Sequence, residues 1–224
     1  LNQTNRGLRQ TFERISSGMR INRAADDSAG LAMAENLQSD FMSLNQSVRN
    51  TNDGISVLQT AEGATNEVSD ILKRMRELAV QSSSETLHNT ERGYIQDEFE
   101  QLTSEIDRIA QVTTFNGIAL GNNANSKLDV QVGIYNTSND RIAIGLGDLR
   151  ASTLGVDIAN LALSNVASSQ SALNTLDVAL NTMNQYRSDY GAVQNRLDSA
   201  LNNLEIYREN IAASESRIRD ADYA

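Results

Sequence analysis

The sequence predicts a mainly α-helical protein, an elongated rod of long antiparallel coiled-coil-like helices with a small β-hairpin subdomain at its tip. Three observations predict this fold. Apolar residues recur every 3.5 positions toward the C-terminal end, none of the 224 residues is proline, and aromatic residues make up only 4%. A helix with a 3.5-residue apolar period cannot bury its stripe alone and must pack against another helix.

The first long helix is predicted from about residue 27 to residue 83. Asp27 and Ser28 offer capping side chains at its start. Its inward apolar positions are first Leu37, Phe41, Leu44, Val48, Ile55 and Leu58. The phase of the pattern then shifts by about one residue and continues at Ala61, Ala64, Val68, Leu72, Met75 and Ala79. Such a slip locally alters a supercoil without ending it. Gly54 and Gly63 each cost about 1 kcal/mol relative to Ala inside a helix and allow a kink.

A second helix and a β-rich region are predicted next. Asn89 or Thr90 can cap the second helix, which should fold back antiparallel because the connection is short. Its stripe is Ile95, Phe99, Leu102, Ile106 and Ile109. The turn signal Asn116-Gly117 ends the helical pattern. Alternating apolar residues at 128–134 and 142–146 then predict a β-hairpin within a small β-rich region over about 116–160.

The last helix is predicted from about residue 168 to residue 214. One apolar row has members seven residues apart, at Leu176, Met183, Tyr190, Leu197, Leu204 and Ile211. A second row lies between them, at Ala172, Ala179, Tyr186, Val193, Ala200 and Tyr207. Together the two rows predict a coiled-coil seam.

Composition excludes several classes of function. The net charge of −10 argues against general binding of nucleic acid or anionic membranes, no run of 18 apolar residues exists to insert into a membrane, and cysteine is absent. The first segment is the basic exception, with Arg6, Arg9, Arg14, Arg20 and Arg23. These arginines could bind a polyanion. We favour charge complementarity with acidic residues near the other end, such as Glu205, Glu209, Glu215, Asp220 and Asp222.

Residues that could carry chemistry are scarce. The single histidine, His88, lies in a polar loop, and 145–147 reads Gly-Leu-Gly without the rest of a phosphate-binding loop. Asp26 and Asp27 lack the other ligands of a calcium loop, so capping is the favoured role. We therefore predict no enzyme activity, no catalytic residue, no cofactor and no metal site.

A surface around residue 78 remains as a candidate binding site. Arg74, Arg76, Glu77 and Gln81 flank the apolar stripe of the first helix, and Leu78 lies at the edge of that stripe. Periodicity favours a core position for Leu78, whereas a partly exposed leucine among arginines would mark a contact site. The pattern does not decide between these alternatives.

Several long motifs, in order, resemble those of bacterial flagellin, the filament subunit of the flagellum. The motifs are Ser16-Ser17-Gly18-Met19-Arg20-Ile21-Asn22, Ala25-Asp26-Asp27, Asn52-Asp53-Gly54-Ile55-Ser56, the stretch 59–64, the stretch 76–81, Phe115-Asn116-Gly117, the stretch 191–197 and the stretch 215–224. The resemblance implies three parts: an N-terminal inner segment and spacer at 1–26, a helical core domain at 27–218 and the start of a C-terminal spacer at 219–224. Family members normally carry further apolar helical sequence at both ends, and many insert large outer domains in the middle.

The resemblance implies a function and partners. It implies a secreted, extracellular subunit that polymerises into the filament, exported by the flagellar apparatus with an export chaperone. Other flagellin subunits and the hook-associated junction and cap proteins would contact it. The alternative is a hook–filament junction adaptor. The resemblance also implies binding to the vertebrate Toll-like receptor that senses flagellin, through Arg74, Leu78 and Glu98 with support from Arg76 and Gln81.

Overall fold

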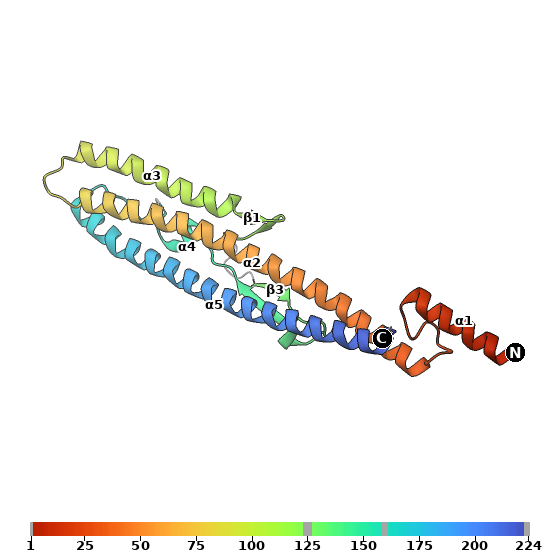
Figure 1. The fold of residues 1–224 in the computed structure, drawn as a ribbon. Coiled ribbons are helices and arrows are strands. Elements are labelled where there is room, and N and C mark those ends of the chain that lie inside the picture. The colour runs from red at the N-terminus through yellow and green to blue at the C-terminus, as the bar shows by residue number, and fades with distance from the viewer. Residues whose placement is uncertain (1, 123–126, 158–160, 222–224) are drawn as a thin grey trace. The chain divides into compact units, whose positions relative to one another are not determined.

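The computed structural model describes residues 2–122, 127–157 and 161–221, most of which are helical (Figure 1). The α-helices are α1 (Asn2–Ser17), α2 (Ser28–Ser82), α3 (Asn89–Val112), α4 (Ala151–Leu154) and α5 (Val166–Arg219). The strands are β1 (Thr114–Phe115), β2 (Ile118–Ala119), β3 (Lys127–Gln131) and β4 (Arg141–Gly145), with a 3-10 turn η1 (Ser138–Asp140) before β4. The predicted mainly α class, with long antiparallel helices and small strand pairs, is confirmed.

The chain forms two compact units, each made of segments that are far apart in the sequence. The first unit contains residues 1–52, 131–141 and 198–224, and the second contains 53–130 and 142–197. The helices α2 and α5 contribute to both units. Each unit therefore has its own part of the α2–α5 pair, and each is described by itself.

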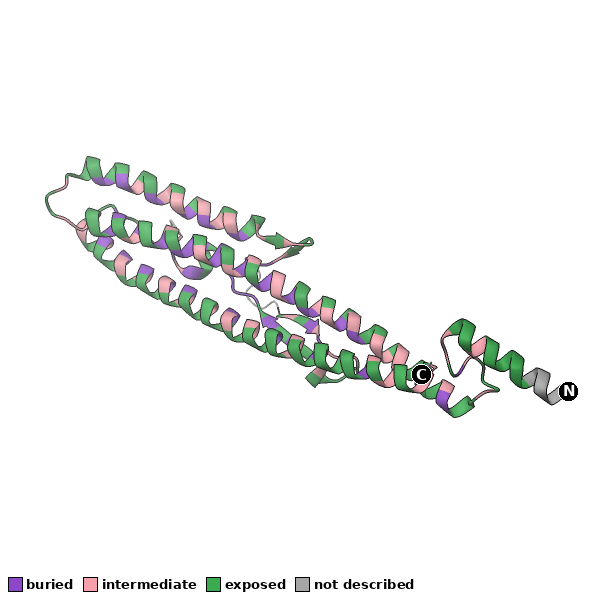
Figure 2. Ribbon diagram, in the orientation of Figure 1, coloured by how far each residue is buried: buried purple, intermediate pink, exposed green. Residues whose placement is uncertain are grey.

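The second unit has a core enclosed by three helices and the segment that contains α4. Its largest fully buried side chains come from α2, α3, α5 and the segment before α5, and they include Leu72, Met75, Phe99, Ile106, Leu149, Leu163 and Leu176. Burial follows the inner faces of the helices, whereas their outer faces are exposed (Figure 2). The stripes predicted for α2 and α3 supply part of this core, and α5 and the segments 149–156 and 161–163 supply much of the rest.

Contacts between α2 and α5 fix their direction in the second unit. The Ser169 hydroxyl donates to the Ser82 hydroxyl at 3.0 Å, and the Arg76 guanidinium pairs with Asp177 at 2.7 Å. Partner numbers rise on α5 as they fall on α2, so the two helices are antiparallel.

The first unit has a smaller core. Leu44, Leu204 and Ile211 are buried together, and Ile134 from the β3–β4 connection packs against them. The Ser47 hydroxyl donates to the carbonyl of Gly133 at 3.2 Å, which holds that connection against α2.

The two predicted rows of α5 differ in burial. Every member of the Leu176–Ile211 row is buried. In the other row Ala172 and Ala179 are buried, but Tyr186 is only partly buried and Tyr207 is exposed. The prediction is wrong for Tyr207. The second unit covers α5 with several segments, whereas the smaller core of the first unit receives only one row.

Two glycine-dependent features explain the β segments. Asn116 and Gly117 have φ angles of +48° and +78° and form the two-residue turn between the antiparallel strands β1 and β2. Gly54 lies in α2, which runs on through it, and a Cβ there would lie 3.0 Å and 3.2 Å from the methyl groups of Val130. The absence of a side chain thus lets β3 approach α2. The hairpin predicted at 128–134 and 142–146 is confirmed as the β3–β4 pair.

The α2–α3 connection is held by a buried arginine that the sequence patterns did not indicate. Arg92 donates from its guanidinium to the carbonyls of Ser82, Ser84 and Leu87 at 3.0, 2.6 and 2.6 Å. The α3 N-cap is His88, one residue before the predicted cap, and its backbone N–H donates to the Glu91 carboxylate. The guanidinium therefore supplies hydrogen-bond donors to backbone carbonyls at the end of α2 and in the connection.

The N-terminal helix α1 exposes its apolar side. Leu8 and Phe12 lie four residues apart on one face and are 56% and 64% exposed. The other face contacts the following loop, where Gln10 donates to Asp26 at 2.6 Å and Arg23 pairs with Glu13 at 2.5 Å.

The favoured interpretation of the basic first segment needs correction. Arg23 pairs within that segment, and Arg20 donates to the backbone carbonyl of Ile218 at 2.9 Å rather than to a carboxylate. The two ends do meet, because the Arg20 N–H donates to the Arg219 carbonyl at 2.7 Å. Among the described residues, hydrogen bonds that involve backbone carbonyls, and not ion pairs with those carboxylates, join the two ends.

We predict that Leu197→Ala destabilises the second unit. Leu197 is 0% exposed in the α5 row, so its truncation removes buried apolar area and leaves a cavity, at a cost of about 2–5 kcal/mol. Chemical unfolding followed by circular dichroism measures this cost. The matched control is Val178→Ala, also on α5 but 63% exposed, which should change little. Equal stability of the two variants would contradict the packing described here.

Candidate interaction surface

The candidate surface centres on the Arg74 guanidinium, which bridges α2 and α3. Its Nε and Nη2 atoms donate to Oε1 of Glu98 at 3.0 and 2.8 Å, and Nη1 donates to Glu77 at 3.0 Å. All three side chains are about half exposed or more. The structure thus brings together Arg74 and Glu98, which are 24 residues apart in the sequence.

The carboxylates orient the guanidinium. Hydrogen bonding to Glu98, and then to Glu77, raises the pKa of Arg74 further above its usual value. Since an arginine is already fully charged at neutral pH, the pKa shift changes no protonation state. It reflects a guanidinium fixed between two acids, in a cluster with one more negative than positive charge.

Leu78 lies beneath this cluster and not on it. Its exposed fraction is 2%, and it belongs to the core that includes Phe99 and Met75. The structure thereby decides the alternative that the sequence left open, in favour of the core position. A role of Leu78 in binding would have to act through the packing that supports Arg74 and Glu98.

Arg76 lies on a different side of α2. Two residues along a helix correspond to a rotation of about 200°, and Arg76 pairs with Asp177 of α5 rather than with α3. This hydrogen bond raises the pKa of Arg76 and lowers the pKa of Asp177. Gln81 is exposed and is seven residues from Arg74, so those two share a face. The predicted receptor-contact residues therefore lie on two sides of α2, with Arg74 facing α3 and Arg76 facing α5.

The other candidates have structural roles. His88 is exposed at the start of α3, and Gly145 is the last residue of β4. Asp27 accepts hydrogen bonds from the N–H groups of Ala29 and Gly30, at the start of α2. Asp26 accepts backbone hydrogen bonds from Arg23 and Asn22, which lower its pKa. Among the described residues no three His, Cys, Asp or Glu side chains gather as metal ligands would.

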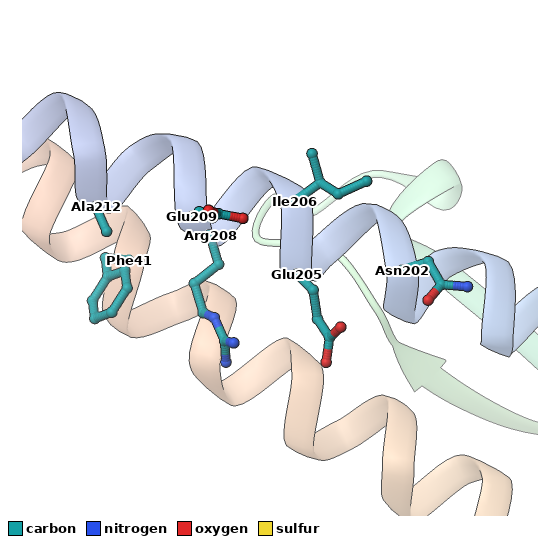
Figure 3. A pocket seen from close by; sticks show the side chains of 7 residues that line it. All are labelled: Phe41, Asn202, Glu205, Ile206, Arg208, Glu209 and Ala212. Atoms are coloured by element: carbon teal, nitrogen blue, oxygen red, sulfur yellow. The ribbon is translucent and has the colours of Figure 1, made fainter.

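A groove of about 640 Å³ lies between α2 and α5 in the first unit (Figure 3). Its lining consists of Phe41, Asn202, Glu205, Ile206, Arg208, Glu209 and Ala212. Figure 3 shows Arg208 and Glu205 pointing toward α2 and Ile206 pointing away from it. Arg208 donates to Asn45 at 3.4 Å, a long contact. The groove is an open helix–helix crevice with mixed charge, which is typical of an interaction surface and not of an enclosed catalytic pocket.

The sequence indicates one partner of the surface but not another. The pattern places Glu77 beside Arg74 on the flank of the stripe, and its spacing of three residues suits the observed pair. Asp177 is 101 residues from Arg76, and no local signal in the sequence points to it.

Comparison with protein families gives two matches. The bacterial flagellin N-terminal helical region matches residues 1–126, and the bacterial flagellin C-terminal helical region matches residues 173–224. A flagellin of Halalkalibacterium halodurans is 43% identical over 215 residues, which cover 96% of this chain and 78% of that protein.

Two solved structures are similar in fold. The crystal structure of Bacillus cereus flagellin superposes with a TM-score of 0.61 at 34% identity, covering 70% of this chain and 88% of that one. A putative flagellar hook-associated protein from Vibrio parahaemolyticus gives a TM-score of 0.71 at 15% identity, covering 87% of this chain and 100% of that one. At that identity the second likeness concerns the fold alone. None of the described helices is long and apolar enough to cross a membrane.

Proposed function

This chain belongs to the bacterial flagellin family, whose members are structural proteins that form the extracellular flagellar filament, and from this premise we propose how the chain contacts its partners. It is a structural subunit of the filament. We propose that it has no catalytic role and that it is exported by the flagellar apparatus with a chaperone. We further propose that hook-associated junction and cap proteins contact it at the ends of the filament.

The observation that best supports assembly is the reversed amphipathicity of α1. A surface helix of a monomeric protein normally turns its apolar face inward, but α1 contacts its own loop with polar residues and exposes Leu8 and Phe12. Exposed apolar area of this kind marks a protein–protein interface. Heterologous contacts that do not close generate open helical polymers, so we propose that this face is covered in the assembled filament.

We predict that Leu8→Ser with Phe12→Ser impairs filament formation by the native protein. The substitutions remove apolar contact area at an interface but no buried contact of the monomer, so helicity should be unchanged. Seeded polymerisation followed by pelleting and electron microscopy measures the effect. The control is Tyr94→Ser with Val178→Ser, which replaces two apolar residues exposed on α3 and α5. Filament yields equal to the parent from the Leu8/Phe12 variant would refute the role of α1.

The hook–filament junction adaptor is the second candidate. The likeness to the Vibrio hook-associated protein is one of fold. The uninterrupted stretch Arg-Glu-Leu-Ala-Val-Gln at 76–81 resembles filament subunits and not junction proteins. We therefore retain the filament subunit as the proposed function.

We also propose that the Arg74 surface binds the vertebrate Toll-like receptor for flagellin. The support is the resemblance of the motif together with the geometry: a guanidinium fixed by Glu77 and Glu98 presents an oriented, partly exposed charge cluster. Gln81 lies on the same face. Arg76 would contribute from the α5 side, and Leu78 would support the cluster from the core.

We predict that Arg74→Ala and Glu98→Ala reduce receptor signalling without unfolding the protein. Both side chains are exposed, so their removal leaves the core intact, and a reporter assay in cells that express the receptor measures the loss. The control is Arg108→Ala, which breaks another exposed ion pair of α3, Arg108–Glu105 at 2.6 Å. Leu78→Ala differs from these two variants, because Leu78 is buried and its truncation should also lower the free energy of unfolding by about 2–5 kcal/mol. Undiminished signalling by folded Arg74→Ala and Glu98→Ala variants would rule the surface out.

A further inference from the structure

The turn between β1 and β2 contains a dipeptide whose asparagine side chain is chemically reactive. Asn116-Gly117 is the one Asn-Gly sequence among the 224 residues. Asparagine is a thermolabile residue, and its side-chain amide is most vulnerable when glycine follows. Glycine has no Cβ to hinder attack by its own backbone nitrogen on the preceding side chain.

The surroundings leave room for that attack. Asn116 and Gly117 are both exposed, and a Cβ placed on Gly117 would meet no atom within 4 Å. The strands beside the turn are two residues long, with the pairs Thr114 to Ala119 and Phe115 to Ile118. So short a hairpin opens at little cost, because strand pairs of this size are marginally stable by themselves. Opening lets the backbone of Asn116 leave its left-handed conformation and reach the geometry for ring closure.

We propose that Asn116 is a site of spontaneous deamidation. The backbone nitrogen of Gly117, after losing its proton, attacks Cγ of Asn116. The new N–Cγ bond closes a five-membered succinimide, the Cγ–Nδ2 bond breaks, and ammonia leaves with the proton. Water then opens the ring: attack at Cγ gives aspartate, and attack at the main-chain carbonyl carbon gives isoaspartate.

The structure identifies another potential succinimide site that is protected. Asp53-Gly54 has the same following glycine but lies inside α2. There the helix fixes the backbone of Gly54, and Val130 packs closely against the Gly54 Cα. The chemistry therefore depends on the fold and not on the dipeptide alone.

The product would alter the surface locally. Each event converts a neutral amide at the turn into a carboxylate, and isoaspartate adds one methylene to the main chain. The segment just after β2 is anchored, because the Leu120 N–H donates to the Thr113 carbonyl at 3.0 Å and Leu120 is buried. The change should open the turn and leave α3 and the core of the second unit intact.

Ageing of the intact folded chain tests the proposal. Samples are held at mildly acidic and mildly alkaline pH over days to weeks and digested with trypsin. Fragment-ion mass spectrometry of the 109–127 peptide then separates Asn116 from the other asparagines of that peptide. Protein isoaspartate methyltransferase with a labelled methyl donor counts isoaspartate independently. The internal reference is Asn136, another exposed loop asparagine, which accepts a hydrogen bond from Arg141 and precedes the branched Thr137.

We expect conversion at Asn116 to be roughly tenfold or more faster than at Asn136, and faster at alkaline pH because the attacking nitrogen must be deprotonated. Asn116→Gln should abolish conversion at position 116 and lower the isoaspartate signal of this peptide, since a six-membered ring closes far more slowly, while Asn136→Gln should change neither. The melting temperature of each variant checks the fold. Conversion of Asn116 no faster than that of Asn136, or independent of pH, would overturn the proposal.

Discussion

The pairing of α2 with α5 is the constraint on which the rest of the structure depends. Both helices carry narrow apolar stripes that another helix must cover, and both contribute residues to the two compact units. Burial of a Val, Leu, Ile or Met side chain contributes about 1.5–3 kcal/mol, and the continuous Leu176–Ile211 row supplies such residues in each unit. The α2–α5 pair positions the other elements. The helices α3 and α4 pack on its faces, and the β3–β4 connection is hydrogen-bonded to α2.

The groups exposed on the surface depend on how completely other segments cover the α2–α5 pair. In the second unit the additional segments bury the core positions of α2 and α5, but Tyr94 and Val178 stay exposed, and ion pairs such as Arg74–Glu98 and Arg76–Asp177 lie on its surface. In the first unit the cover is thinner, and large apolar groups such as Phe12, Ile206 and Tyr207 stay exposed. For a polymer subunit such exposed apolar groups are useful, because they supply contact area that other chains can cover.

Periodicity predicted the helices well because burial on one face is a local, repeating property. The bounds of α2 and the buried row of α5 follow directly from it, and the Asn-Gly turn follows from backbone conformation. Tyr207 was predicted wrongly because the pattern shows that a residue can be buried but not whether another segment arrives to cover it. Leu78 was ambiguous for the same reason. Arg92 and Asp177 could not be predicted, since their partners are backbone carbonyls of a loop and a side chain 101 residues away.

Native-state hydrogen exchange of the folded chain tests the central claim most directly. If α2 and α5 share one core, the amides of 64–79 and 172–183 should show the slowest exchange and closely similar protection, because they open only together. The amides of α1, which contributes no residue to that core, should exchange much earlier. Exchange of 172–183 well before 64–79, or protection of α1 equal to theirs, would contradict the account.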